Sequence, residues 1–308
     1  MSQIKKPHQL ISGEKDVTSF VLRAMANTDD PRLQAIVTSL VTHLHQFVME
    51  TRPTEQEFEF GLRWLAALGQ HTNESNNEVV LAADVLGIST LVDLINNDGL
   101  QGETMSALLG PFYRGDAPIC AAGDCIARAG TPGPRIYFSG RVTGVDGAPI
   151  AQASLDVWQA SPVGLYENQD ASQPDLNLRG KFTTDREGRF AFTSVRPAGY
   201  PVPTNGPVGD LLRAQNRAPM RPAHIHFIVS APGHKTLITQ VFFDHAEALE
   251  QDVVFGAKQP LVGGFVEHRS ADPAYPGAEP PFFSATYDFK LVPGTPCFPV
   301  PPITGKTR

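Results

Sequence analysis

Residues 221–230 read Arg-Pro-Ala-His-Ile-His-Phe-Ile-Val-Ser, and this stretch guides the interpretation of the whole chain. A proline followed by a run of β-branched and aromatic residues is typical of a short β-strand. Because side chains two residues apart on a strand point to the same face, His224 and His226 project together, and the apolar residues between and after them point to the opposite face. Two imidazoles on one face form half of a metal site, although a buried strand histidine is more often only hydrogen bonded.

The composition is that of an ordinary globular protein. The chain has 308 residues, of which 41% are hydrophobic and 19% charged, enough for one large domain or two modest ones. A net charge of −7 gives no electrostatic reason to expect a nucleic acid or an acidic membrane as a partner. The first residues lack the apolar run of a secretory signal, and no stretch approaches the ~20 apolar residues of a membrane span, so we expect a cytoplasmic protein.

The chain has three cysteines, Cys120, Cys125 and Cys297. An odd number in a chain of this length argues against a disulfide framework and favours a reducing compartment. A zinc site at Cys120 and Cys125 would need a second ligand pair of similar spacing, which the sequence lacks. We therefore expect no metal at these cysteines.

The first hundred residues show helical periodicity. Apolar residues recur every three or four positions over residues 33–48, which predicts an amphipathic helix. A capping box at residues 54–57 predicts the start of a second helix, with Gly69 as its C-terminal cap. His43 and His45 lie two positions apart in the first of these helices, about 200° around its axis, so they cannot bind one ion together.

Two further helices are expected before residue 105. A second capping box at residues 75–78 precedes a short apolar run that Gly87 ends. Ser89 begins another helix, which ends near Asn97. The sequence therefore predicts four or five helices with short connections, in a helical region over residues 1–105.

From Arg135 onward the pattern changes to that of short β-strands. Strands at this spacing, joined by turns rich in glycine and proline, predict an antiparallel sandwich over residues 106–308 and an α+β fold for the chain. One predicted hairpin joins Phe182 to Phe192 through the turn at residues 185–188. The other predicted strands cover residues 136–142, 155–159, 224–230, 237–243 and 285–292.

Two irregular loops between these strands carry tyrosines. Tyr166 lies in residues 163–170 and Tyr200 in residues 197–209, both rich in glycine or proline. Loop residues held by a β scaffold are where functional sites tend to lie. A loop tyrosine more often only packs and makes one hydrogen bond.

The residues alone leave two ways to complete a metal site with the two histidines. A carboxylate ligand from the segment Asp244–Glu247, which also contains His245, would form a site for ferrous iron. Tyrosine ligands would instead favour ferric iron, because phenol has a solution pKa near ~10 and only a strongly Lewis-acidic ion deprotonates it readily at neutral pH.

The chain resembles the intradiol ring-cleavage dioxygenases of the catechol 1,2-dioxygenase type, from the helical region to about Val292. The matching stretches are Gly110-Pro-Phe-Tyr113, Asp156-Val-Trp-Gln159, Gly164-Leu-Tyr166, Arg179-Gly-Lys-Phe182, Pro197-Ala-Gly-Tyr200-Pro-Val-Pro and Arg221-Pro-Ala-His-Ile-His-Phe227. The resemblance implies one mononuclear non-haem ferric ion per chain. Its implied ligands are Tyr166, Tyr200, His224 and His226.

The resemblance also implies an activity, the cleavage of an aromatic ring with O2 between two carbons that carry adjacent hydroxyl groups. Tyr200 is then the ligand that the substrate displaces, and the released ligand takes a substrate proton. Arg221 and Gln240 match polar residues of such sites and are expected to stabilise negative charge on the ring and to orient substrate or hydroxide. The alternative for Arg221 is a purely structural ion pair.

By the same analogy the substrate pocket is lined by Leu81, Asp84, Leu108, Leu109, Pro111, Phe112 and Phe265. Residues 81–87 and 110–112 are more similar to hydroxyquinol 1,2-dioxygenases than to catechol enzymes. Asp84 could accept a hydrogen bond from a third ring hydroxyl, or it could be a helix surface carboxylate or a dimer contact. We therefore expect benzene-1,2,4-triol (hydroxyquinol) as the substrate and 3-hydroxy-cis,cis-muconate or maleylacetate as the product. The alternative is a catechol, methylcatechol or chlorocatechol, which would give cis,cis-muconates.

Three further expectations concern partners and termini. In such enzymes the N-terminal helices form a homodimer around an apolar tunnel that can hold lipid, and the apolar positions in residues 33–48 are compatible with this. A non-enzymatic, transthyretin-like binding sandwich would account for residues 140–150 but leaves the helical region unexplained. The last fifteen residues are expected to form a surface tail.

Overall fold

The computed structural model describes residues 10–73, 76–97, 99, 101–303, 305 and 306. The chain forms two compact units, Met1–Leu65 and Ala66–Arg308. None of the helices among the described residues is long and apolar enough to span a membrane. The predicted boundary at residue 105 between a dimerisation region and a catalytic domain stays a prediction.

The N-terminal unit contains α1 (Glu14–Ala24), α2 (Pro31–Thr51) and the first part of α3 (Glu55–His71). α2 begins after Asp30, whose side chain accepts hydrogen bonds from the first turn, and it ends at Arg52 in the left-handed conformation. The capping box at residues 54–57 is confirmed, since Thr54 and Glu57 each donate a backbone N–H to the other's side chain, over 2.8 and 3.3 Å. His45 Nδ1 lies 3.0 Å from Thr18 Oγ1, so this histidine joins α1 to α2.

Two predicted helix caps differ from the structure. α3 continues past Gly69 to His71, so Gly69 is not its cap; the helix ends where the N–H of Thr72 bonds to Gly69 O (3.2 Å). α4 (Glu78–Val85) is capped by Asn77, whose side chain accepts from the N–H of Val80, whereas Ser75 lies outside the described residues. Gly87, with φ of 74°, separates α4 from α5 (Ile88–Asn96), as predicted.

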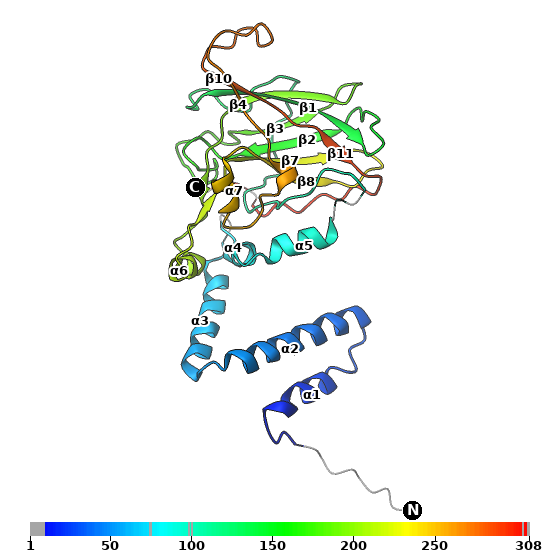
Figure 1. Ribbon diagram of the computed structural model, residues 1–308, viewed down its shortest axis with the longest axis vertical. Helices are drawn as coiled ribbons and strands as arrows, with labels where there is room; N and C mark the ends of the chain where they lie inside the picture. The colour runs from blue at the N-terminus through cyan, green and yellow to red at the C-terminus, as the bar shows by residue number, and fades with distance from the viewer. Residues whose placement is uncertain (1–9, 74–75, 98, 100, 304, 307–308) are drawn as a thin grey trace, which may run out of the picture. The chain divides into compact units, whose positions relative to one another are not determined.

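The larger unit is a β-sandwich of two sheets, with α4 and α5 on the side where β8 lies (Figure 1). The five-stranded sheet contains β1 (Arg135–Gly144), β4 (Arg189–Val195), β9 (Val266–His268), β10 (Phe282–Thr286) and β11 (Phe289–Leu291). The four-stranded sheet has the order β3 (Arg179–Thr183), β2 (Ser154–Gln159), β7 (His224–Ser230) and β8 (Leu237–Phe242). The remaining elements are β5 (Tyr200–Pro201), β6 (Met220–Arg221), α6 (Pro207–Ala214), α7 (Ala246–Glu250) and a 3-10 turn at Gln259–Leu261.

The pairing corrects two details of the predicted sandwich. β3 and β4 do not form a hairpin, because β3 pairs with β2 and β4 pairs with β1 in the other sheet. The turn at residues 185–188 therefore connects the two sheets. The predicted strand over residues 285–292 is two strands, and both run parallel to β1, so the five-stranded sheet is mixed.

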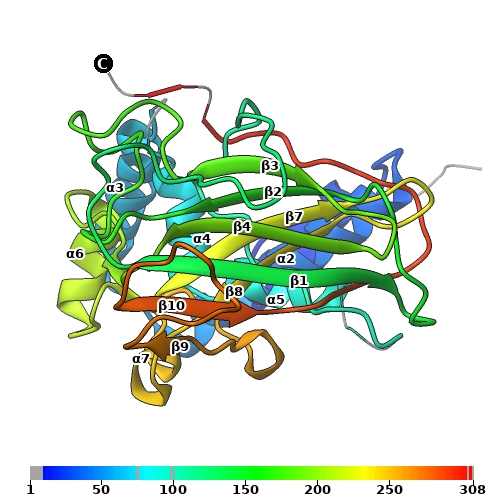
Figure 2. The same cartoon turned by 90° about the horizontal axis from the view of Figure 1, so that it is seen from above.

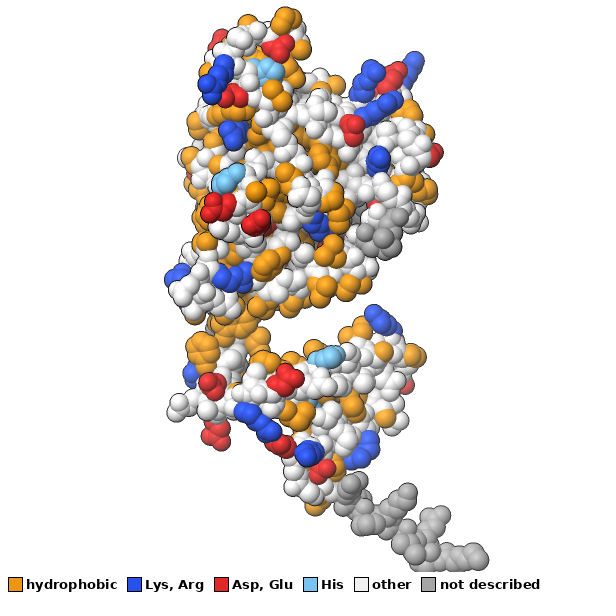
Figure 3. Space-filling view, viewed as in Figure 1, with side chains coloured by type: hydrophobic (Ala, Val, Ile, Leu, Met, Phe, Trp, Pro, Cys, Tyr) orange, Lys and Arg blue, Asp and Glu red, His pale blue; other side chains and the backbone are white. Residues whose placement is uncertain are grey.

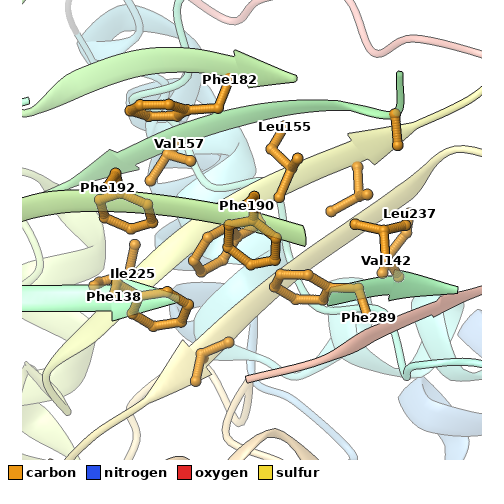
Figure 4. Close-up of a cluster of buried hydrophobic side chains, with 14 of the residues drawn as sticks. Phe138, Val142, Leu155, Val157, Phe182, Phe190, Phe192, Ile225, Leu237 and Phe289 are labelled. Atoms are coloured by element: carbon orange, nitrogen blue, oxygen red, sulfur yellow. The ribbon is translucent and has the colours of Figure 1, made fainter. Parts of the chain in front are cut away.

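The core lies between the two sheets, and Figure 4 shows side chains from both pointing toward one another. Phe138 on β1 stacks on Phe192 of β4 at 5.1 Å and contacts Phe227 of β7 at 5.3 Å between ring centroids. All three rings are at most 1% exposed. Because successive side chains of a strand alternate between faces, this packing of Phe227 sends its neighbour His226 to the outer face of the four-stranded sheet. The predicted division of this strand into an apolar and a histidine face is confirmed.

The last residues of the chain are not entirely a surface tail. Val300 is 87% exposed, but Ile303 is only 4% exposed and belongs to a buried cluster on the outer face of the four-stranded sheet. Composition suggested a tail because the segment is rich in proline and polar residues. Burial of this one apolar side chain fixes the position of the segment at residue 303.

The corrected end of α3 can be tested with Gly69→Ala. A Cβ at Gly69 would have no atom within 4 Å, and alanine is favoured over glycine inside a helix, so the free energy of unfolding should rise by about 0.5–1 kcal/mol. Urea denaturation measures this difference. Gly87→Ala is the matched control: its positive φ should make that variant less stable. A loss of stability in Gly69→Ala would contradict the helical placement of residue 69.

Candidate metal centre

β7 places two histidines on the outer face of the four-stranded sheet. His224 and His226 are both buried, and their Nε2 atoms lie 3.1 Å apart. The Nδ1 atom of His224 lies 2.7 Å from the carbonyl oxygen of Pro222, which assigns the proton to Nδ1 and leaves a lone pair on Nε2. The ring of His226 stacks on Trp158 of β2, with centroids 4.6 Å apart and planes at 9°, and this contact fixes its orientation.

The loop between β2 and β3 brings Tyr166 to these imidazoles. The backbone N–H of Tyr166 donates to the side chain of Gln169 over 3.0 Å, and the N–H of Gln169 donates back to Tyr166 O over 2.9 Å. This short turn points the phenol inward. Its hydroxyl oxygen lies 3.0 Å from His226 Nε2.

The second tyrosine comes from the short pair of strands β5 and β6. Tyr200 pairs with Arg221 across this ladder, and its hydroxyl lies 3.1 Å from that of Tyr166 and 3.4 Å from His224 Nε2. Gly164 supports this approach of the two loops: its φ is +81°, and a Cβ there would lie 2.9 Å from the Cβ of Tyr200. The structure thus brings together all four residues that the resemblance implied as ligands.

Burial sets the protonation of this cluster in the metal-free protein. It lowers the pKa of His224 to about 3, with a further contribution from the charge of Arg221, and it lowers the pKa of His226 well below its usual value. Both imidazoles are therefore neutral at pH 7. Burial also raises the pKa of Tyr166 well above its usual value, and it raises the pKa of Tyr200. The phenols can lose their protons here only if a strong positive charge lies between them.

The arrangement of the four donor atoms fits a single bound cation. Ligands about 2.0 Å from one ion lie about 2.8 Å apart at right angles and about 3.3 Å apart at tetrahedral angles. The contacts within the cluster measure 3.0, 3.1, 3.1 and 3.4 Å.

The carboxylate alternative is not supported. Among residues 10–303 as described, no three His, Cys, Asp or Glu side chains lie close enough together to hold a metal ion. Asp244 accepts from the backbone N–H of Ala223 over 3.2 Å and contacts His245 Nδ1 at 2.8 Å, so its two oxygens are used. A site of two histidines with Asp244 or Glu247 does not form.

Arg221 lies beside the cluster in a buried charge network. Its Nη1 lies 3.2 Å from His224 Nε2, its Nη2 donates to Gln240 Oε1 over 2.8 Å, and its Nε donates to Asp252 Oδ1 over 3.1 Å. Burial alone would raise the pKa of Asp252, but the charge and hydrogen bonds of Arg221 hold it below its usual range. Arg221 is therefore held in a buried ion pair and also lies beside the cluster, and its role toward a substrate stays a prediction.

Asp252 was not anticipated from the sequence. An arginine that is buried near a metal needs a counter-ion, so some acidic residue was to be expected beside Arg221. This requirement did not identify which of the chain's acidic residues supplies the charge. Asp252 lies in the turn after α7, where its side chain also accepts from the N–H groups of Gly256 and Ala257, each over 3.0 Å.

A narrow cavity opens beside Tyr200 and Arg221. Its wall is formed in part by five of the seven residues expected in the pocket, namely Leu81, Asp84, Leu108, Pro111 and Phe112. Asp84 is 6% exposed, so it is not a surface carboxylate, and burial raises its pKa although a hydrogen bond from Ser89 partly offsets this. An uncommon buried carboxyl group therefore lies in the cavity wall.

The other two expected pocket residues lie elsewhere. Leu109 lines a neighbouring cavity of about 460 Å³ beside α5, together with Val92 and Ile238. Phe265 stacks on Phe243 at 4.2 Å and packs against the sandwich core, which corrects its assignment to the pocket. The residues not anticipated in the cavity wall are Gly110, Val202, Pro203 and Val254. The first three lie in the two motifs that suggested the site, but no sequence signal pointed to Val254.

The structure defines a β-sandwich with two tyrosines and two histidines brought together on the outer face of one sheet, and comparison with known proteins gives the family. Residues 108–293 match the family model described as Dioxygenase, and residues 30–104 match the model described as Catechol dioxygenase N terminus. The chain belongs to the intradiol ring-cleavage dioxygenases and is an enzyme.

Individual relatives cover almost the whole chain. The chain is 42% identical to a hydroxyquinol 1,2-dioxygenase of Rhizobium sp. (strain MTP-10005), over 90% of this chain and 95% of that protein. The structure of hydroxyquinol 1,2-dioxygenase from Pseudomonas putida DLL-E4 is similar with a TM-score of 0.85 and 38% identity, over 91% of this chain and 99% of that one. Catechol 1,2-dioxygenase from Pseudomonas arvilla C-1 gives a TM-score of 0.77 and 29% identity, over 94% of each chain.

The role of Asp252 can be tested with Asp252→Asn. The amide would leave the charge of Arg221 buried without a counter-ion, which should lower the free energy of unfolding of the metal-free protein by about 3 kcal/mol. Urea denaturation with a chelator present measures the loss. Asp244→Asn is the control, because its side chain is 26% exposed and should contribute less than about 1 kcal/mol. Equal losses in the two variants would contradict the assignment of Asp252.

Proposed function

We propose that the four-residue cluster binds one ferric ion through Tyr166, Tyr200, His224 and His226. The observation that supports this most directly is the convergence of their donor atoms in a buried site, where each donor atom lies 3.0 to 3.4 Å from two of the others. Ferric iron is favoured because two phenolates would balance two of its three charges in a place where an unpaired charge is costly. When bound, ferric iron supplies Lewis acidity that activates a ring diolate toward O2.

The surrounding residues would bind and orient the diol. The cavity beside Tyr200 is lined by this one proposed ligand and has largely apolar walls, which suit an aromatic ring. Tyr200 lines this cavity and belongs to the cluster, so it would hold the ion in the absence of substrate and would take one substrate proton when the diol binds. Arg221 lies in the same wall, and its positive charge would stabilise negative charge that develops on the ring.

Gln240 acts through Arg221 in this scheme. Its side-chain oxygen accepts from Arg221 Nη2, while its amide nitrogen donates to Leu108 O over 2.5 Å. Gln240 therefore connects the guanidinium to the backbone of the cavity wall, which supports its role in orienting the substrate. Its side chain is completely buried, so the contact is shielded from solvent.

The proposed substrate is hydroxyquinol, benzene-1,2,4-triol. Asp84 supplies a buried hydrogen-bond acceptor in an otherwise largely apolar cavity wall, and a third ring hydroxyl is the substrate feature that it would satisfy. The names of the hydroxyquinol dioxygenases that are 42% and 38% identical support the same choice. Addition of both atoms of O2 between the adjacent hydroxyl-bearing carbons gives 3-hydroxy-cis,cis-muconate, or its tautomer maleylacetate.

We further propose that residues 1–105 form the dimerisation region and residues 106–308 the catalytic domain. Apolar side chains are exposed along α2, and Figure 3 shows hydrophobic groups at the surface of the N-terminal unit. They include Leu33, Ile36, Leu40, Leu44, Phe47 and Val48, each between 46% and 58% exposed. An exposed apolar stripe of this length supports a homodimer contact. Bound lipid and a cytoplasmic location stay predictions.

The proposed ligands can be tested by Tyr166→Phe and Tyr200→Phe in iron-loaded protein. Tyrosinate bound to ferric iron should give a visible charge-transfer band, and each substitution should remove or shift it and lower kcat at least about 100-fold. Tyr137→Phe, whose ring packs on Tyr275 at 5.1 Å outside the cluster, is the control. A band that survives unchanged in either ligand variant would exclude that residue as a ligand. Wild-type protein that takes up no iron would exclude the proposed centre.

The proposed substrate preference can be tested by Asp84→Leu. Loss of the buried acceptor should lower kcat/KM for hydroxyquinol about 10- to 100-fold, as expected for a hydrogen bond to a charged group, with little loss for catechol, which has no third hydroxyl. Steady-state oxygen consumption on both substrates gives the ratio. Asp93→Asn on α5 is the control carboxylate. A wild-type enzyme with higher kcat/KM for catechol would overturn the preference.

A further inference from the structure

The C-terminal segment, residues 298–306 as far as described, returns to the metal site. Figure 2 shows the chain beyond β11, in red, passing β3 toward the green loops at the end of the sandwich. Val300 is almost fully exposed, whereas Ile303 inserts into a buried cluster. That cluster also contains Phe112 of the cavity wall, Trp158, which stacks on His226, and the metal-site residue Tyr166.

The segment also contacts the loop that carries Tyr166. Lys306 Nζ donates to the carbonyl oxygen of Gln173, and it lies 3.5 Å from that of Ala171. Both acceptors are backbone atoms of the loop between β2 and β3. Two residues of the segment, three positions apart, therefore act on the surroundings of Tyr166 by different means. Ile303 packs in the same apolar cluster as Tyr166, and Lys306 forms hydrogen bonds to the loop that carries it.

The contact of Lys306 continues to Tyr166 through one side chain. Gln173 Nε2 donates to Leu165 O over 3.1 Å, and Leu165 directly precedes Tyr166. The amide oxygen of Gln173 accepts from Asn177 over 3.0 Å, which fixes the orientation of that amide. Movement of Lys306 would thus change the support of the peptide bond that precedes the tyrosine.

We propose that the C-terminal segment positions Tyr166 for the metal, with Ile303 and Lys306 as positioning residues; this inference rests on the proposed iron centre. Tyr166 lies on a loop, and its phenol must keep one orientation to stay within reach of the imidazoles. Loops of this kind exchange conformations unless other elements hold them. The C-terminal segment supplies this support to the loop between β2 and β3, beyond the ends of the two strands themselves.

A merely stabilising segment would affect the whole protein, whereas a positioning segment affects the Tyr166 loop first. Ile303→Ala removes the apolar contact and Lys306→Met removes the hydrogen bonds, so the two variants test the same role by different chemistry. Val300→Ala is the matched control, because it truncates an exposed side chain of the same segment. Ile303→Val and Lys306→Arg are the conservative variants, and both should restore wild-type behaviour.

The first measurement uses metal-free protein. Hydrogen–deuterium exchange of the peptide over residues 161–178 should be at least fivefold faster in Ile303→Ala and in Lys306→Met than in wild type. Exchange in a peptide over β7 should be unchanged, which separates a local effect from global loss of stability. Loop exchange equal to that of Val300→Ala in both variants would overturn the proposal.

The second measurement uses iron-loaded protein. Both variants should show a shifted or broadened charge-transfer band and should release iron to a chelator at least tenfold faster than wild type and Val300→Ala. An unchanged band and release rate in both variants would also overturn the proposal. A wild-type protein that binds iron without a charge-transfer band would instead overturn the iron centre, while loop exchange would still report whether the segment holds the loop.

Discussion

Complete burial of β7 is the constraint on which the rest of the structure depends. All seven of its residues are buried, so both faces of this central strand must be covered. The second sheet covers the face of Ile225, Phe227 and Val229 with a core of aromatic rings. The other face carries two imidazoles that a hydrophobic layer could not satisfy. The loops that carry Phe112, Tyr166 and Tyr200 cover it, together with the C-terminal segment. A single alternating strand therefore specifies both the sandwich and the place where the loops must meet.

The loops that cover the histidines create an electrostatic environment that suits a highly charged metal ion. Neutral imidazoles and protonated phenols can share a buried site, but a carboxylate there would need a counter-ion of its own. The charge of Asp252 is compensated by Arg221, and Asp84 lies in the wall of the cavity and not in the cluster. The chain thus keeps permanent negative charge out of the cluster, so that the charge of a bound ion would be balanced by the phenols once they ionise.

Local sequence patterns correctly predicted those features of the structure that depend on only one or two neighbouring residues. The alternation around His224, the capping box at residues 54–57 and the stop at Gly87 all follow from backbone geometry that the residue types themselves determine. The convergence of the tyrosine loops on the histidines did not follow from spacing and required resemblance to a family. Predictions failed where a distant partner decides the outcome. The turn at residues 185–188 is typical of a hairpin, yet the strands on either side of it pair with β1 and β2.

Side chains of the same type also occupy different environments, because tertiary contacts that cannot be read from the sequence decide where each one packs. Phe112 and Phe265 were both expected in the pocket, but only Phe112 lies there, because Phe265 finds aromatic partners at the edge of the core. Ile303 shows the converse. A single apolar residue in a segment rich in proline is buried because the outer face of the sheet leaves a place for it.

The parallel pairing of β1 with β10 has a consequence for the order of folding. Ile136 is opposite Phe283, so the two halves of this ladder are separated by 147 residues of chain. The strands β2, β3, β7 and β8, with both tyrosine loops, lie between them in sequence and can pair with one another while translation continues. One edge of β1 remains open until residues 282–291 have been synthesised, so β1 must avoid pairing with other chains during that time. The histidine-bearing sheet can therefore form before the sheet that closes over its core.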